Sequence, residues 1–289
     1  MDNRPKEKTL LIADSGATKA DWCLVRGREI IQRFTSKGIS PVFQTGEEMT
    51  REIRENVLPP LQEAPIRNIY FYGSGCTPEN VPIVSEALQA VFPLETIEVH
   101  SDLIAAAHAL CGREAGIACI LGTGSNSCEW DGTRVVKHIS PLGFILGDEG
   151  SGAALGKQLV SDALKNRLTE GLKEALLEEY GLTPTLVIDK VYRQPFPSRF
   201  LASLSPFLLK HIDDPSIHRI VHQGFSDFFE RNVMQYHYKK MSVHFVGSIA
   251  WHYAAILKEV AAERGIQVGK IAQSPIEGLI EYHVSLLTY

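Results

Sequence analysis

The chain has 289 residues, of which 44% are hydrophobic and 22% charged, and its formal net charge is −5. This composition is typical of a globular protein with enough residues for two domains, and it excludes a disordered or fibrous chain. The negative charge and the lack of a basic run argue against nucleic acid as a partner.

The N-terminus is polar and lacks the apolar core of a signal peptide, and no apolar run has the length that a membrane span needs. The five cysteines form no C-x-x-C pair. Cys23, Cys119 and Cys128 lie in apolar strand patterns, where we expect small buried thiols. These features predict a cytoplasmic protein without a membrane partner.

The first predicted element is a buried strand over 10–13, which ends on the carboxylate of Asp14. A loop with Ser15, Gly16 and Thr18 follows, and a second strand over 22–25 comes too soon for a crossover helix, so the two strands are antiparallel. Such a loop can bind phosphate, with Asp14 holding a metal ion. An ordinary polar hairpin is the alternative, and the two common glycine-rich phosphate patterns, GxxxxGK[ST] and GxGxxG, are absent here.

Strands and helices alternate after this hairpin. The pattern predicts a strand over 29–34, a helix over 47–57 that Leu58-Pro59-Pro60 stops, a strand over 68–72, a helix over 80–91, a strand over 96–99 and a helix over 103–111. This order indicates an α/β half-domain with a mixed sheet.

A similar hairpin recurs about a hundred residues later, with strands over 117–121 and 126–130 around the loop Gly122-Thr123-Gly124-Ser125. A third strand is expected over 134–139. The repeat indicates two similar half-domains, with the boundary between Gly112 and Gly116. Two phosphate-binding hairpins of this kind suggest a nucleotide held between the halves.

The second half contains long helical stretches. We expect a glycine-rich segment over 141–152, a helix over 153–168, a largely helical region over 170–240, a strand over 243–246 and helices over 250–264 and 276–287. Phe225, Phe228 and Phe229 are predicted to lie in the core. The ten histidines show no spacing that indicates a metal site, and we expect His100 and His108 at the surface or at the rim of a cleft.

Asp102 is the candidate general base, because it follows the strand over 96–99, and ligands gather at the carboxyl ends of strands in α/β sheets. The alternative is that Asp102 only caps the helix that begins at Leu103.

Five motifs resemble those of the actin-like ATPases, the superfamily of sugar kinases, actin and heat-shock chaperones. Within it, the chain is similar to the group that holds N-acetylglucosamine kinases and the BadF/BadG/BcrA/BcrD-type ATPases. The motifs are Asp14-Ser15-Gly16-Ala17-Thr18-Lys19, Gly122-Thr123-Gly124-Ser125-Asn126, Gly147-Asp148-Glu149-Gly150-Ser151, Val246-Gly247-Ser248 and Ser274-Pro275-Ile276-Glu277-Gly278-Leu279.

The resemblance implies two actin-like (ribonuclease H-like) lobes of the α/β class, each a mixed five-stranded sheet with helices on its faces, and an active-site cleft between them. The lobes would span 1–112 and 113–289, with a helical insertion over about 153–240 in the second. The C-terminal helix over 276–289 is able to pack back on the first lobe.

The activity implied is an ATP-dependent kinase that phosphorylates a hydroxyl of an amino sugar, with ATP and Mg²⁺ as cofactors and a homodimer as a possible assembly. The residues carried over from the family pattern fall into five roles. They are Asp102 as catalytic base; Asp14 on the metal; Ser15, Gly16, Thr18, Lys19, Gly122, Thr123 and Gly124 on the phosphates; Gly247 and Ser248 on adenosine; and Ser40, Ser74, Asn126, Gly143, Asp148 and Glu149 on the sugar.

Two departures from the kinase pattern leave the sugar open. Ser40 stands where these kinases tend to carry Asn, and Pro141-Leu142-Gly143 stands where they carry Gly-Trp-Gly. N-acetylglucosamine and N-acetylmuramate both remain candidates. For Asn126, Asp148 and Glu149 the alternative to sugar binding is that they only hold a glycine-rich loop together.

Two other functions remain open. A dehydratase-activating ATPase of the BadF/BcrA kind would hold an iron–sulfur cluster through cysteines, but Cys76 and Cys111 fit that position poorly. A sugar- and nucleotide-binding protein without turnover is the third reading.

Overall fold

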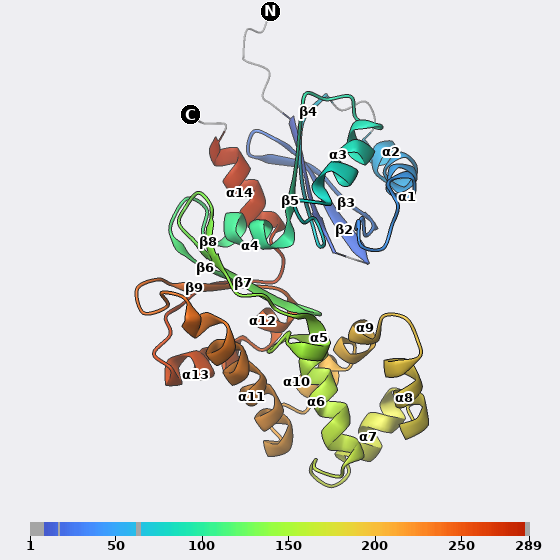
Figure 1. Cartoon of the computed structure of the whole chain (residues 1–289), viewed down its shortest axis with the longest axis vertical. Coiled ribbons are helices and arrows are strands. Elements are labelled where there is room, and N and C mark those ends of the chain that lie inside the picture. The colour runs from blue at the N-terminus through green and yellow to red at the C-terminus, as the bar shows by residue number, and fades with distance from the viewer. Residues whose placement is uncertain (1–8, 17, 62–64, 287–289) are drawn as a thin grey trace, which may run out of the picture. The chain divides into compact units, whose positions relative to one another are not determined.

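The computed structural model describes residues 9–16, 18–61 and 65–286, and the chain forms two compact units. The first unit comprises the chain up to Gly112 together with the segment from Pro275 onward, and the second runs from Arg113 to Ser274. The C-terminal helix α14 (Ile276–Leu286) packs on the helix α4 (Asp102–Leu110) and on the first strands of the chain (Figure 1). It therefore belongs to the first unit.

The sheet of the first unit has five strands in the order β3-β2-β1-β4-β5. The strands β1 and β2 pair in antiparallel fashion, as the short loop predicted, and β3 continues the meander. The strands β4 and β5 run parallel to β1. Their bounds are β1 Thr9–Ser15, β2 Lys19–Arg26, β3 Glu29–Lys37, β4 Ile66–Gly73 and β5 Thr96–Ser101.

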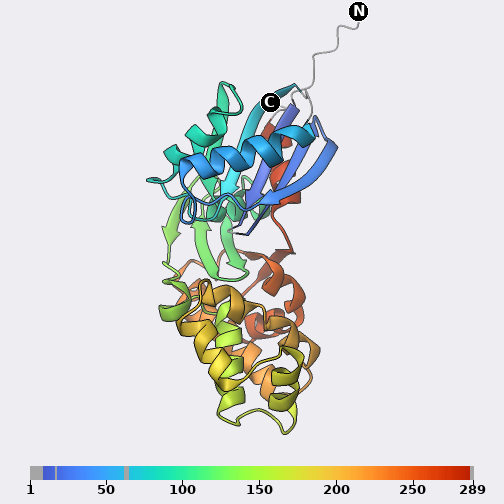
Figure 2. The same ribbon diagram turned by 90° about the vertical axis from the view of Figure 1, so that its right-hand side faces the viewer.

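The central strand β1 is buried on both faces because helices cover the sheet on each side (Figures 1 and 2). Leu11 and Ala13 lie in a core with residues of α1 (Gly46–Glu52) and α3 (Val81–Gln89). Leu10 and Ile12 lie in a second core with residues of α4 and α14. Successive side chains of a strand point to opposite faces, so a strand that is buried on both faces needs an uninterrupted apolar run.

The helical segment after β3 runs further than predicted. It passes from α1 through a π-helical segment η1 (Ile53–Val57) into α2 (Leu58–Leu61), so the prediction that Pro59 and Pro60 stop the helix is wrong. The N–H of Leu58 donates to the carbonyl of Ile53, five residues back. This wider turn makes room for proline rings that an α-helix interior would exclude.

The second unit repeats the topology of the first, with strand order β10-β9-β6-β7-β8. The strands are β6 Gly116–Leu121, β7 Ser125–Trp130, β8 Val135–His138, β9 Val243–Val246 and β10 Val268–Ala272. The order confirms two mixed five-stranded sheets with helices. The strand β10 was not assigned from sequence, because its residues are half-buried or exposed and include Gly269 and Lys270.

Helices fill the chain between β8 and β9 and flank β10. They are α5 Gly143–Leu146, α6 Gly152–Leu164, α7 Leu172–Glu179, α8 Pro184–Tyr192, α9 Pro197–Ala202, α10 Ser205–Lys210, α11 Pro215–Arg231, η2 Val233–Gln235, α12 Ser248–His252 and α13 Ala254–Glu263. Phe225, Phe228 and Phe229 are fully buried in this unit, as predicted. The expected helix over 250–264 is broken at Tyr253 into α12 and α13.

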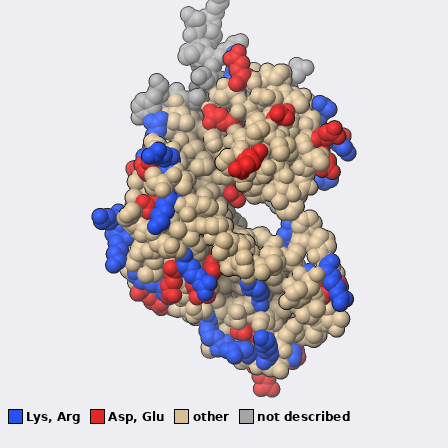
Figure 3. Space-filling view, viewed as in Figure 1, with Lys and Arg blue, Asp and Glu red and all other residues tan. Residues whose placement is uncertain are grey.

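Within the described parts of the chain, no helix is both long and apolar enough to cross a bilayer. On the face drawn in Figure 3, acidic and basic side chains are interspersed, and no continuous basic surface is visible there.

Candidate functional site

In the first unit, three predicted site residues lie at one edge of the sheet. The parallel strands β1, β4 and β5 end in register, since Ser15 pairs with Gly73 and Gly73 with Ser101. Asp14 is the penultimate residue of β1, Ser74 follows β4, and Asp102 follows β5. Adjacent strands are about 4.8 Å apart, so these side chains share a small region.

Asp102 occupies the first turn of α4 and does not cap it. The cap is Ser101, whose hydroxyl accepts the N–H of Ile104 at 3.4 Å, so the alternative role of Asp102 as the cap is wrong. Burial raises the pKa of Asp102 to about 6, against the lowering effect of the N–H groups of Leu103 and Asp102. A carboxyl group with such a pKa can accept a proton near neutral pH.

Asp14 lies in an electronegative setting. Burial, and then the negative charges of Asp102 and Asp21, raise the pKa of Asp14 to about 7, while Lys19 lowers it. The ammonium of Lys19 is 2.6 Å from Asp21, so Asp21 already has a cationic partner. Among the described residues, no donor forms a hydrogen bond with the Asp14 carboxylate. A divalent cation at Asp14 would relieve this repulsion, and carboxylate oxygen suits Mg²⁺.

The predicted phosphate loop after β1 is tight and exposed. The N–H of Gly16 donates to the carbonyl of Lys19 at 3.0 Å, and the carbonyl of Thr18 accepts from the N–H of Gly38 at 2.9 Å. Gly16, Thr18 and Lys19 are exposed, whereas Ala17 lies outside the described residues. Backbone and side-chain groups of this loop are therefore open to a ligand.

The hydroxyl of Ser15, in contrast, is buried and already engaged. It accepts the N–H of Ile39 at 2.8 Å and donates to the carbonyl of Ile39 at 2.9 Å. The hydroxyl of Ser40 donates to the carbonyl of Ser74 at 3.2 Å, and the N–H of Ser74 donates to the carbonyl of Ser15 at 2.9 Å. The structure thus brings Ser15, Ser40 and Ser74 together and uses their hydrogen bonds to fix the loops after β3 and β4.

In the second unit, the loop Gly122-Thr123-Gly124 forms hydrogen bonds with the N-terminus of α6. The first N–H groups of this helix, from Gly152 and Ala153, donate to the carbonyls of Gly122 and Thr123 at 2.8 and 3.0 Å. Among the described residues, the N–H groups of Thr123 and Gly124 have no protein acceptor. The carbonyls of Gly122 and Thr123 thus accept hydrogen bonds from α6, and the N–H groups of Thr123 and Gly124 remain available to bind an anion.

Asp148 supports the same loop. One carboxylate oxygen accepts the N–H of Ser125 at 3.3 Å, and the other would lie 3.0 Å from a Cβ at Gly124. Position 124 therefore favours glycine because Asp148 packs against it. Burial raises the pKa of Asp148.

The other predicted sugar residues of this unit have varied partners. Glu149 is held by the guanidinium of Arg231 at 3.4 Å and the amide of Asn232 at 3.5 Å. The amide oxygen of Asn126 accepts from the N–H of Ser127 and from His138, both at 2.9 Å. Gly143 is the first residue of α5, with a φ of +74°.

Gly247 and Ser248 lie next to the loop after β6. Gly247 has a φ of +123°, and a Cβ there would approach the carbonyl oxygen of Leu121 to 2.3 Å, so only glycine fits. Its N–H donates to the carbonyl of Ala272 at 3.0 Å, and Ser248 begins α12. The predicted adenosine and phosphate residues of the second unit are therefore neighbours in the fold.

Two groups of histidines make close side-chain contacts. His108 and His283 both form hydrogen bonds with the hydroxyl of Tyr72. His218 and His222 lie on one face of α11, where they face Glu259 and Glu263 of α13. The four-residue spacing of His218 and His222 was the signal available in the sequence. His108 is buried, so the expectation of a surface or cleft-rim residue is wrong for it.

No protein-family model matches the chain, and comparison with curated proteins gave no match. A crystal structure from Porphyromonas gingivalis, of a protein provisionally named N-acetylglucosamine kinase, is 48% identical, with a TM-score of 0.93 over 96% of this chain and 99% of that chain. A protein of the same provisional name from Chromobacterium violaceum is 18% identical, with a TM-score of 0.74 over 96% and 99% of the two chains.

A ROK-family glucokinase from Streptomyces griseus, solved with glucose and AMPPNP, is 16% identical, with a TM-score of 0.58 over 96% of this chain and 98% of that chain. The two distant structures share the fold. The protein from Porphyromonas gingivalis shares sequence as well, over nearly the full length of both chains.

Proposed function

Because the chain belongs to the N-acetylglucosamine kinase-like branch of the actin-like ATPase superfamily, we propose that it is an ATP-dependent kinase for a hydroxyl of an amino sugar. The observation that supports this most is the half-buried carboxyl of Asp102 at the carboxyl edge of three parallel strands, beside the electronegative Asp14. Such an edge is where α/β sheets bind their ligands.

Asp102 acts as the general base in this proposal. Phosphoryl transfer needs an aligned acceptor hydroxyl and a group that takes its proton. A carboxyl with a pKa of about 6 is ionised at neutral pH and still basic enough to accept that proton. Its place in the first turn of α4 fixes the carboxylate on a rigid element.

Each unit has a loop that suits phosphate. The unsatisfied N–H groups of Thr123 and Gly124 suit phosphate oxygens, and the exposed Thr18 and Lys19 add a hydroxyl and a positive charge. Gly16 has no side chain, so the backbone of the first loop can approach a phosphate closely. Gly247 and Ser248 are proposed to contact adenosine, since they adjoin the loop after β6.

The residues around Asp14 fit a magnesium ion. Asp14 has two carboxylates nearby, a raised pKa and no hydrogen-bond donor among the described residues. A bound Mg²⁺ would neutralise charge on the transferred phosphate. Asp14 would hold this cation, and Asp102 would then be free to accept the proton of the sugar hydroxyl.

The sugar is proposed to be N-acetylglucosamine or N-acetylmuramate. In this proposal Ser74, Asn126, Gly143, Asp148 and Glu149 are the candidates for direct sugar contacts. Ser40 is buried and its hydroxyl donates to the carbonyl of Ser74, so its role would be to hold that loop rather than to contact the sugar. Asp148 supports the loop at Gly124, and Glu149 is held by Arg231, so both carboxylates are pre-positioned for sugar hydroxyls.

The competing function, a dehydratase-activating ATPase, lacks support from the cysteines. All five are buried thiols, as predicted for Cys23, Cys119 and Cys128, so none offers an exposed ligand to a shared iron–sulfur cluster.

The test incubates the protein with Mg-ATP and a panel of sugars, and follows ADP release and the phosphosugar by ³¹P NMR. The expected result is ADP release that depends on an N-acetylated amino sugar. Sugar-independent hydrolysis, or nucleotide binding with no turnover on any sugar, would contradict the proposal.

The matched variants are Asp102→Asn and Asp213→Asn. Loss of the base should lower turnover about 10²- to 10⁴-fold with ATP affinity unchanged. Asp213 is exposed and lies in the second unit, so its amide variant should keep wild-type turnover. Full activity of the Asp102→Asn protein would disprove the role of the base.

A further inference from the structure

Four side chains that could bind a metal face one another between α11 and α13 of the second unit. His218 and His222 are one turn apart on α11, and Glu259 and Glu263 are one turn apart on α13. Residues four apart share a helix face, so each helix presents two ligand groups to the other.

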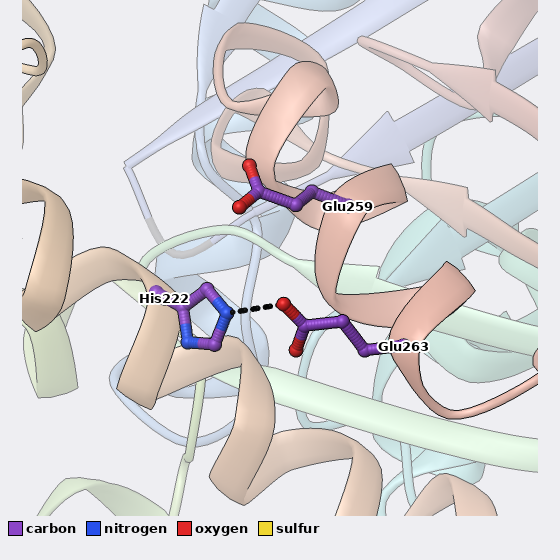
Figure 4. A group of neighbouring side chains, drawn as sticks. All are labelled: His222, Glu259 and Glu263. Carbon is purple, nitrogen blue, oxygen red and sulfur yellow. Dashed lines mark hydrogen bonds and ion pairs between the residues drawn. The ribbon is translucent and has the colours of Figure 1, made fainter.

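Three of the four groups have ligand atoms close enough to share one ion, and the fourth, His218, lies near one of them. The Nε2 of His222 lies 3.1 Å from Glu263, and one ligand atom from each of His222, Glu259 and Glu263 lies within 4.8 Å of the other two (Figure 4). The Nε2 of His218 lies 3.7 Å from Glu259. Ligands about 2 Å from a tetrahedral Zn²⁺ are separated by roughly 3.3 Å, and the two His–Glu distances of 3.1 and 3.7 Å are close to that spacing.

One ligand is also held in place from behind. The guanidinium of Arg264 lies 3.2 Å from one oxygen of Glu263, while the other oxygen faces His222. Arg264 is in turn fixed by the hydroxyl of Ser226 at 2.8 Å and by Glu230 at 3.0 Å. Outer partners of this kind orient ligating carboxylates in metal sites.

We propose that His218, His222, Glu259 and Glu263 form a zinc site that clamps α11 to α13. Two imidazole nitrogens and two carboxylate oxygens match the tetrahedral preference of Zn²⁺, whereas Mg²⁺ prefers oxygen ligands and octahedral geometry. The site is distinct from Asp14, which lies in the other unit. Because the ion binds the folded chain, it stabilises the second unit.

The test uses chain freed of metal with a chelator, titrated with ZnCl₂ by calorimetry and with CoCl₂ by visible absorption. We expect one Zn²⁺ per chain at this site, a tetrahedral Co²⁺ spectrum, and a rise in melting temperature with Zn²⁺ that Mg²⁺ does not give. The variant His222→Ala should lose at least about 10-fold in Zn²⁺ affinity, together with the Co²⁺ spectrum.

The control is His252→Ala, which removes an exposed histidine at the end of α12 and should bind Zn²⁺ as the wild type does. A second variant, Glu259→Gln, should weaken binding without removing the His222–Glu263 ion pair. The proposal is overturned if the wild type binds no Zn²⁺, or if His222→Ala and Glu259→Gln bind it as tightly as the wild type. Turnover with sugar is read separately, so failure here leaves the kinase proposal untouched.

Discussion

A buried Tyr–His–His network in the first unit should make its stability fall in mild acid. The hydroxyl of Tyr72 lies 2.8 Å from Nδ1 of His108 and 2.7 Å from Nε2 of His283, linking β4 to α4 and α14. Since a hydroxyl has one proton, it donates to one ring and accepts an N–H from the other. The Nδ1 of His283 is buried with no partner, so the neutral ring carries its proton on Nε2 and donates to Tyr72.

Protonation of His283 would place a new N–H at this buried Nδ1. Burial, and then the charges of His108 and His100, lower the pKa of His283 to about 3, and burial lowers that of His108 to about 4. The unfolded chain protonates both below about pH 6.5, so the folded state loses stability as the pH falls. Each histidine contributes about 1.4 kcal/mol per pH unit until its folded pKa is reached.

The perturbation is His283→Phe, which keeps an aromatic ring against Tyr70 but removes the titrating group. Urea unfolding at pH 7.5, 6.5, 5.5 and 4.5 gives the free energy of unfolding at each pH. Between pH 6 and 4.5, the variant should lose about 1.4 kcal/mol less per pH unit than the wild type. The exposed His252 provides the control, since His252→Ala should keep the wild-type slope. Equal slopes for His283→Phe and the wild type would refute the reasoning.

Three further substitutions test local features. Gly247→Ala should destabilise the chain by at least about 2 kcal/mol in urea unfolding, more than Gly265→Ala, which has a positive φ but no atom within 4 Å of its Cβ. Ser15→Ala should cost about 1–3 kcal/mol in the same assay, because the buried N–H of Ile39 loses its acceptor. Glu149→Gln should change stability by less than about 1 kcal/mol. Because Glu149 is a proposed sugar contact, the Glu149→Gln variant should show a higher KM for the sugar in steady-state kinetics. An unchanged KM would mean that Glu149 only holds the loop.

The sheets were predictable because their central strands are continuous apolar runs, which can be recognised from the local sequence alone. The apolar run at 10–13 is buried on both faces, and the short loop after Asp14 permits only an antiparallel partner. The strand β10 has no such signal, since it lies at the edge of its sheet and its side chains are only partly buried. Its place depends on pairing with β9, whose residues lie about 25 positions earlier in the chain, and local sequence does not reveal that pairing.

The places of the candidate site residues on the strands could be predicted from the sequence, but their hydrogen bonds could not. The position of Asp102 after a strand could be read from the sequence, but the identity of the cap could not, since Ser101 and Asp102 are both good capping residues. The engagement of Ser15 by Ile39 joins residues 24 apart, and the bond of Tyr72 to His283 joins residues 211 apart. Such contacts follow from the tertiary fold.

The repeated topology explains how charge is divided between the units. The strands β1 and β6 hold the same place in their sheets, as do β5 and β10. At the ends of β1 and β5 stand the carboxyl groups of Asp14 and Asp102, whereas β6 is followed by Gly122 and β10 by Gln273. Two carboxylates repel a polyphosphate unless a cation lies between, while backbone N–H donors attract it directly. In the proposed function, the carboxyl edge of the sheet would therefore hold the cation and the base in the first unit, and the same edge would bind phosphate oxygens in the second.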